Sequence, residues 1–408
     1  MVRPLPSLEK ISKTIKDPFS ENRIMAVIEI CDYLVSLSFA ISHVDQIFIE
    51  ESFTKEAKSN SESDILLALK ELCSEHLNKS QNYQYLILPN HRLATTGRSG
   101  VSLPRPDPET IITQTELENT ISKGLWKIFS NQRIRAGKKT ESSDINLALF
   151  SAEFLNIKLD KNRVSHPVGF KAKILELWCE QTIVSKSLLQ GIYSILPEEE
   201  IALIKESAGV VSDLIFSSTE KEEDFLLAEI GLAETAFYRS RGQAFYYLDK
   251  ITWGTDKLFN AISRSLGVAK SEAIEVFKIY QNKSASIPVL KKLETIISEE
   301  AAVLLRGIEQ YQRKADLSRI YTHSFLFIGD MLNDPSLKRR LGISLQIRPV
   351  DKKFIGEKFN FELKLNVQIS ALQNNTVLVG AVKNLEIKKT SPALEKITQQ
   401  RARLLQDS

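Results

Sequence analysis

Cysteine and histidine are the residue types here best suited to ligating a metal, and their spacing argues against a zinc site. The three cysteines, Cys31, Cys73 and Cys179, lie far apart in the sequence, and the five histidines are equally scattered. A structural zinc site usually takes its ligands in close pairs, and an odd number of cysteines gives no disulfide framework. This usage is typical of a protein of the reducing cytoplasm.

The charge balance argues against a nucleic-acid binder. The 408 residues have a net charge of +3, whereas such binders usually concentrate a stronger basic excess on one element. The most basic short stretch, Arg133 to Lys139, is interpreted as a solvated loop. Apolar residues make up 43% and charged residues 26%, which indicates a folded globular protein with two or three domains.

The termini predict a cytoplasmic protein that touches a membrane at most peripherally. The N-terminus is polar, with Pro4 and Pro6, and the sequence lacks the run of about twenty apolar residues that spans a bilayer. Each end has a weak amphipathic stripe, which suits either membrane contact or a helix that docks on a partner. The stripes consist of Leu5, Leu8, Ile11 and Ile15 at one end, and Leu394, Ile397, Leu404 and Leu405 at the other.

The first hundred residues predict the start of an α/β domain. Apolar, β-branched runs at 24–30, 33–41 and 44–50 have short connections and indicate an antiparallel meander. A helix capped by Ser63 follows, and then a short buried strand at 85–88 that Pro89 ends.

Residues 97–108 contain two glycines and three prolines, a composition that predicts a domain boundary. Beyond it the patterns predict a helix at 109–129, strands at 144–159 and 174–184, and a helix at 185–196. These elements indicate a small α/β insert of roughly ninety residues.

The second half again alternates strands with helices. A buried strand at 225–230 ends in Gly231, and a hairpin turns at Arg241 and Gly242. Helices are expected at 256–266, 271–280 and 289–311, and further strands at 325–328 and 359–369.

Three segments carry a resemblance to a known family. They are Ser165-His166-Pro167-Val168-Gly169-Phe170-Lys171-Ala172, Ala228 to Thr235, and Ile251 to Asp256 with Leu266 to Ala273. In this order they resemble the bacterial actin-like proteins of the FtsA and PilM family, which carry a small insert called an SHS2 module. The resemblance implies an α/β, actin-like (ribonuclease H-like) fold of two lobes with that insert.

The same resemblance implies a division of the chain. The expected parts are an N-terminal tail (1–20), a first lobe (21–96 and 198–222), the insert (97–197), a second lobe (223–350), a return to the first lobe (351–390) and a C-terminal tail (391–408).

The resemblance further implies an ATP site with Mg²⁺ between the lobes, where two tight turns hold the phosphates. The positions of this sequence that match the family's site are Glu29, Cys31, Asp32, Tyr33, Glu229, Gly231, Leu232, Ala233, Glu234, Thr235, Gly329 and Asp330.

These loops depart from the family's pattern in ways that oppose phosphate. The first loop has lost its glycine and both hydroxyls and contains Asp32, while Leu232, Ala233 and Glu234 stand where the second loop has glycines and threonine. An uncompensated negative charge about 4 Å from a phosphate costs on the order of 1 to 4 kcal/mol. We therefore expect weak ATP binding and weak or absent ATPase activity, unless Asp32 and Glu234 recruit a cation or point away.

The resemblance implies an interaction protein rather than an enzyme. An FtsA-like chain would act in cell division, bind a tubulin-like polymer and self-associate through the insert. The first alternative is a PilM-like adaptor of type IV pilus assembly, and the second is a working actin-like ATPase. Protein partners are expected in the first two cases and nucleic acid in none.

Overall fold

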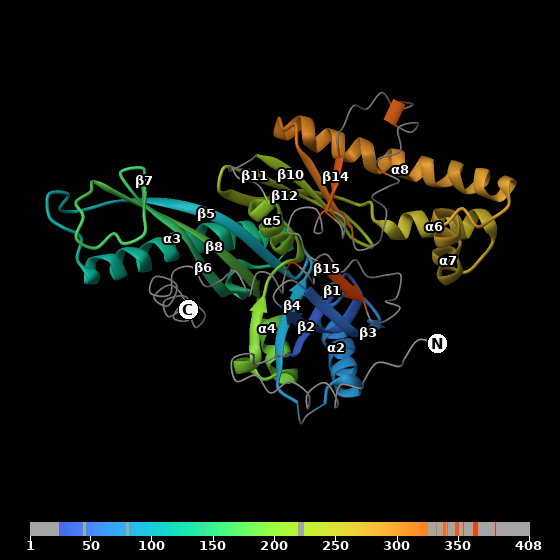
Figure 1. The fold of residues 1–408 in the computed structure, drawn as a ribbon, viewed down its shortest axis with the longest axis horizontal. Coiled ribbons are helices and arrows are strands. Elements are labelled where there is room, and N and C mark those ends of the chain that lie inside the picture. The colour runs from blue at the N-terminus through green and yellow to red at the C-terminus, as the bar shows by residue number, and fades with distance from the viewer. Residues whose placement is uncertain are drawn as a thin grey trace.

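The computed structural model describes most of the chain in five stretches. These are residues 24–43, 46–78, 81–140, 142–218 and 224–324, together with positions 332, 338, 339, 341, 347–350, 354, 362–365 and 380. Their strands form two sheets, in the orders β15-β3-β2-β1-β4-β9 and β14-β13-β10-β11-β12-β5-β8-β6-β7. Figure 1 shows two lobes and a long extension that contains β5, β6, β8 and α3.

The first lobe contains the predicted meander. β1 (Ile24–Cys31), β2 (Leu34–His43) and β3 (Gln46–Glu56) pair antiparallel in chain order. β4 (Tyr83–Pro89) is parallel to β1, and β9 (Ile201–Ile204) is parallel to β4. Parallel strands are usually covered on both faces, and β1 is accordingly buried along almost its whole length.

Helices cover the two faces of this sheet. α2 (Glu62–His76) and α4 (Lys186–Ile195) pack on the face that carries Ala26 and Ile28. α5 (Ser207–Ser218) packs on the opposite face. Ser61, rather than the expected Ser63, caps α2, because its hydroxyl accepts the N–H of Asp64.

The second lobe is a sheet with three helices on one face. β10 (Phe225–Ile230), β11 (Thr235–Arg241) and β12 (Ala244–Ile251) pair antiparallel, and β13 (Ile320–Ser324) is parallel to β10. β14 (Ile347–Pro349) is parallel to β13.

The helices of the second lobe are α6 (Thr255–Leu266), α7 (Lys270–Gln281) and α8 (Ile287–Ala315). They share one apolar core with alternate residues of β10. The other face of β10, through Phe225 and Leu227, packs with α5 in the core that also contains first-lobe residues. α5 therefore joins the two sheets.

The extension is the insert, and it begins earlier than the sequence predicted. Residues 97–108 do not form a boundary loop, because β5 (Ala94–Pro104) runs through most of them and pairs with β8 (Ile174–Ser185). A Cβ on Gly100 would lie 2.4 Å from the indole of Trp178. This glycine therefore makes room for a large side chain within a strand. Because glycine is also common in turns, the sequence predicted a boundary loop here.

The remaining insert elements are α3 (Gln114–Thr140), the short helix η1 (Asp144–Asn146), β6 (Leu147–Leu159) and β7 (Asn162–Val164). Leu175 and Leu177 of β8 face α3 in the insert core, and Trp178 lies half-buried on the opposite face. α3 continues through Arg133 to Lys139, so this stretch is helical and not a solvated loop.

The insert contacts both lobes. Its sheet continues into the second lobe where Arg98 of β5 pairs with Phe245 of β12. Lys205, directly after β9, forms ion pairs with Glu180 of β8 and Asp213 of α5. α4 lies within the predicted insert range 97–197, yet it packs against the first lobe.

The structure describes only part of the C-terminal region for which elements were predicted. Of the expected strand at 359–369, β15 (Glu362–Leu365) lies parallel to β3 at the edge of the first sheet. The expected strand at 325–328, Gly329, Asp330 and both terminal tails lie outside the described residues. No helix of the described stretches combines the length and the apolar composition of a membrane span.

Candidate functional site

Asp32 lies at the tip of the turn that joins β1 to β2 and reaches across to the second lobe. Cys31 pairs with Leu34, so Asp32 and Tyr33 form a two-residue turn, and Asp32 has a φ of 53°. Aspartate tolerates this left-handed conformation better than most residues. We call Asp32 and Tyr33 the inter-lobe turn.

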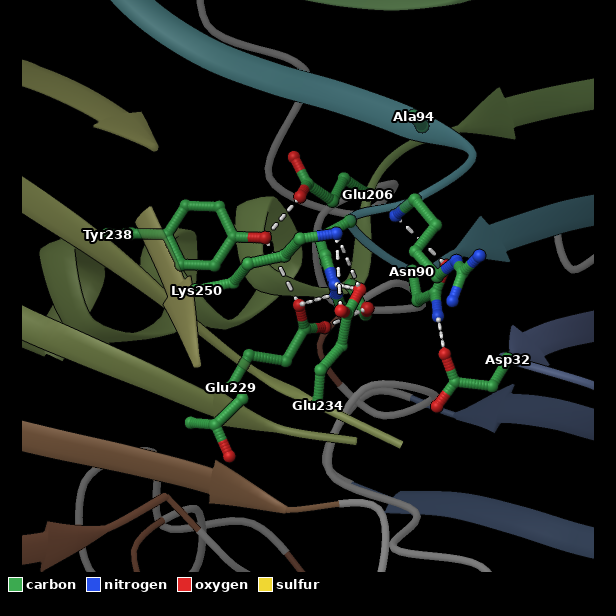
Figure 2. A network of polar contacts seen from close by, with 12 residues as sticks. Asp32, Asn90, Ala94, Glu206, Glu229, Glu234, Tyr238 and Lys250 are labelled. Atoms are coloured by element: carbon green, nitrogen blue, oxygen red, sulfur yellow. Dashed lines mark hydrogen bonds and ion pairs between the residues drawn. The ribbon is translucent and has the colours of Figure 1, made fainter. Parts of the chain in front are cut away.

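The Asp32 carboxylate accepts three hydrogen bonds. Its Oδ2 atom accepts the backbone N–H groups of Leu232 and Ala233, at 2.9 and 3.0 Å. Its Oδ1 atom accepts a hydrogen bond of 3.0 Å from the side-chain amide of Asn90, the residue directly after β4 (Figure 2). Asp32 is only 2% exposed. The carboxylate therefore links the first lobe to the loop between β10 and β11.

That loop, Gly231 to Glu234, is held in shape by the start of α6. The backbone N–H of Asp256 donates to the Leu232 carbonyl at 2.9 Å, and the Gly231 N–H donates to the Glu234 carbonyl at 3.0 Å. The Thr235 hydroxyl donates to the Trp253 carbonyl at 2.7 Å. These contacts fix the direction in which the Leu232 and Ala233 N–H groups point.

Tyr33 makes a second contact between the lobes. Its hydroxyl donates to Asp256 at 2.9 Å and accepts from Lys270 at 3.0 Å. Lys270 also forms an ion pair with Asp256 at 2.8 Å. Both residues of the inter-lobe turn are thus engaged with the second lobe.

Glu234 points away from Asp32 and is neutralised by cations. His91 Nε2 lies 2.7 Å from its carboxylate, and Lys250 Nζ lies 3.2 Å from it. Burial by itself raises the pKa of Glu234, but the His91 hydrogen bond and the two cations lower the pKa to about 2. The alternative that this side chain points away from the loop is confirmed by its contacts.

His91 also faces Glu229 of β10, whose carboxylate lies 3.6 Å from Nδ1. Burial lowers the pKa of His91, and the hydrogen bonds to Glu229 and Glu234 more than offset this, so the pKa is raised. His91 belongs to the first lobe and both carboxylates to the second. Its imidazole is therefore a buried partner of carboxylates from the opposite lobe.

Further polar groups complete this network, as Figure 2 shows. The Tyr238 hydroxyl donates to Glu206 and lies 3.1 Å from Glu229. Glu206 accepts the Thr96 N–H at 2.6 Å and forms an ion pair with Lys139. Each of these carboxylates therefore has several partners, as buried charges require.

Glu29 is the exception. Its Oε2 atom is buried and has no hydrogen-bond partner, and burial raises its pKa to about 8. It lines a cavity of about 20 Å³ together with Cys31, His91, Glu229 and His323. A cavity of that size holds about one water molecule.

The structure brings together the predicted site residues of the first loop and of β10 and the loop after it, whereas Gly329 and Asp330 lie outside the described residues. The described part of the site does not fit a phosphate with Mg²⁺. The loop N–H groups that could hold a phosphate already bind Asp32, and the cavity that the described residues enclose beside them, about 20 Å³, is too small for a phosphate group. Among the described residues, no three acidic, cysteine or histidine side chains are grouped to hold a metal ion.

Sequence reasoning missed Asn90, His91, Lys139, Glu206 and Tyr238. Asn90 and His91 follow a buried strand parallel to β1, so their position at the strand's carboxyl end was the available signal. Lys139 was hidden by its basic neighbours, although its side chain is buried against Glu206.

The fold is similar to that of known structures. No protein-family model and no curated protein sequence matches the chain. The structure superposes on a PilM–PilN type IV pilus biogenesis complex with a TM-score of 0.50 and 15% identity, over 89% of this chain and 98% of that one.

This chain has the actin-like fold. Two other actin-like matches are more distant. A Bacteroides thetaiotaomicron protein with an actin-like ATPase fold gives a TM-score of 0.38 at 10% identity, over 88% of this chain and 96% of that one. Bacillus thuringiensis ParM with ADP gives a TM-score of 0.36 at 10% identity, over 90% of this chain and 100% of that one. Scores this low do not establish a common fold by themselves, so the assignment rests on the PilM structure.

Proposed function

We propose that this protein is an actin-like adaptor that binds protein partners and does not turn over nucleotide. The observation that carries the proposal is that buried side chains around Asp32 and His91 join the two lobes where the family's phosphates would lie. A protein that must admit and release ATP needs this space open. An adaptor needs only a stable shape.

The partners we propose belong to a type IV pilus assembly machine on the inner face of the cell membrane. The similarity to PilM in its complex with PilN supports this choice. A second candidate is an FtsA-like role in cell division, which the segment Ser165 to Ala172 favours through its resemblance to the SHS2 insert.

The insert is the part we propose to contact partners or a second copy of the chain. Four large apolar side chains of the insert are exposed to solvent, and large exposed apolar patches mark interaction sites. They are Ile111, Val168, Phe170 and Ile174. Backbone hydrogen bonds hold the segments that carry them together, for example from the Ile112 N–H to the Phe170 carbonyl at 2.8 Å.

Quantitative capture from the native cell tests this proposal. The tagged chain would be cross-linked in cells, purified with and without prior nucleotide depletion, and its partners counted by mass spectrometry. We expect enrichment of pilus-assembly proteins that nucleotide depletion does not change. The exposed substitution Lys173→Glu should leave the fold intact and weaken partner binding or self-association.

Other outcomes decide between the alternatives. Enrichment of division proteins instead would favour the FtsA-like role. Purified chain that hydrolyses ATP rapidly, with no enriched partner in either machine, would contradict the adaptor.

A further inference from the structure

The backbone N–H groups of Leu232 and Ala233 form a site for an oxyanion. Both donate to one carboxylate oxygen, at 2.9 and 3.0 Å. Adjacent N–H groups that converge on one point create a local positive potential, and hydrogen bonds to an ionised oxygen are stronger than neutral ones.

The loop is shaped closely around that oxygen. A Cβ built on Gly231 would lie 3.2 Å from Asp32 Oδ2 and 3.1 Å from the Glu234 carbonyl. Any larger residue at position 231 would push the carboxylate away or open the loop. The absence of a side chain at Gly231 therefore allows an oxyanion to lie close to the loop at this point.

The neighbouring charges leave the site suitable for a single anion. Glu234, the nearest acidic residue of the loop, is turned toward His91 and Lys250 and does not compete for the N–H groups. Asn90 supplies a third donor from the first lobe at 3.0 Å. Three donors from two lobes thus converge on the Asp32 carboxylate.

We propose that Asp32 is a built-in ligand of a cryptic oxyanion site, which holds the two lobes together without any bound nucleotide. Removing this carboxylate would leave the three donors free to bind a small external oxyanion such as phosphate or pyrophosphate. The cavity that the described residues enclose beside the site is about 20 Å³, which leaves no room for an adenosine on that side.

The test compares two substitutions at one position. Glycine accepts the φ of 53° at the turn and removes the side chain, whereas asparagine keeps its size and loses its charge. By calorimetry, Asp32→Gly should bind pyrophosphate at least tenfold more tightly than wild type, and ADP no more tightly than pyrophosphate. Asp32→Asn should gain no anion binding, because its side chain still fills the site.

Cys31 gives an independent readout, because it is buried beside the turn. Alkylation of Cys31 by iodoacetamide should rise in Asp32→Gly and fall again when pyrophosphate is added. Cys73 and Cys179 are also buried and serve as internal references.

A folded Asp32→Gly protein that binds pyrophosphate no better than wild type would overturn the proposal. Wild-type protein that already binds pyrophosphate at micromolar concentration would overturn it too. If Asp32→Gly does not fold, amide exchange in Asp32→Asn tests the proposal instead. Its Leu232 and Ala233 amides should exchange at least tenfold faster than in wild type, and an unchanged rate would refute the built-in ligand. None of these outcomes depends on which partner the adaptor binds.

Discussion

Two turns of this molecule use the same local chemistry for different purposes. The inter-lobe turn has Asp32 at a φ of 53°, and the turn between β6 and β7, Asp160 and Lys161, has Asp160 at 46°. We call the second one the insert turn. Both carboxylates accept two backbone N–H groups. Asp160 accepts those of Lys173 and Ile174 at 3.0 and 2.9 Å.

The difference lies in where the donors come from. Those of Asp160 are 13 and 14 residues away and exposed, whereas those of Asp32 are 200 and 201 residues away, one buried and one partly buried. A hydrogen bond to a charged group contributes roughly 1.5 to 3 kcal/mol when buried, and solvent screening weakens an exposed one. The Asp160 contact therefore stabilises only its own turn, whereas the Asp32 contact links the two lobes.

The largest expected effect is a pH dependence of the free energy of unfolding, which we expect from Glu29 between the lobes and not from the insert turn. Burial raises the pKa of Glu29 from 4.5 to about 8, so this group favours the folded state below pH 4.5 and loses that contribution as the pH rises through 8. A change of this size corresponds to roughly 5 kcal/mol. Glu29→Gln should therefore be more stable than wild type at pH 8.5 and similar to it at pH 4.5.

Urea unfolding at the two pH values measures this difference. Exposed Glu109 of the insert provides the matched control, and Glu109→Gln should follow wild type at both pH values. Equal pH dependence in wild type and Glu29→Gln would show that Glu29 is not buried as described.

Loss of the buried His91 side chain comes next in size. His91→Ala leaves Glu229 and Glu234 without their shared partner, and breaking a buried ion pair costs about 3 to 5 kcal/mol. Exposed His166, in the insert, is the matched control, and His166→Ala should change the free energy of unfolding by less than about 0.5 kcal/mol. Similar losses in the two variants would remove the distinction between the regions.

The two aspartates can be compared directly. Asp32→Asn should lower the free energy of unfolding by about 1.5 to 3 kcal/mol, because a buried charged acceptor is lost. Asp160→Asn should cause a smaller loss, since its carboxylate is solvated. The measurement is chemical unfolding at pH 7 for both variants. A larger loss at Asp160 would reverse the comparison.

A smaller effect tests the backbone of the insert. Gly169 has a φ of 91° and open space around its Cα, so only conformational strain opposes a side chain there. Gly169→Val should lower the stability of the insert by roughly 1 to 3 kcal/mol. Amide exchange should show faster opening of β8 while β1 is unchanged, and Val168→Ala serves as the exposed control.

The sequence allowed the α/β fold and many of its strands and helices to be predicted, because apolar periodicity and strand ends are local signals. It misplaced the start of the insert, since Gly97 and Gly100 indicate a turn until the indole of Trp178 is known to lie over Gly100. The prediction of a solvated loop at Arg133 to Lys139 was wrong for the same reason. Lys139 pairs with Glu206, which is far away in sequence.

The candidate site shows the same limit in its chemistry. Asp32 and Glu234 were identified from sequence as negative charges that would repel a phosphate. The structure gives each of them donors that no local pattern specifies, namely two backbone N–H groups for Asp32 and His91 for Glu234. The sign of a charge can be read from a sequence, but its partner depends on the fold.

Amide hydrogen exchange at Leu232 and Ala233, measured with and without Mg-ATP, tests the central claim most directly. Because Asp32 already accepts both N–H groups, we predict slow exchange in nucleotide-free protein and no change when nucleotide is added. Fast exchange of these two amides in nucleotide-free protein, followed by protection on addition of Mg-ATP, would contradict the account.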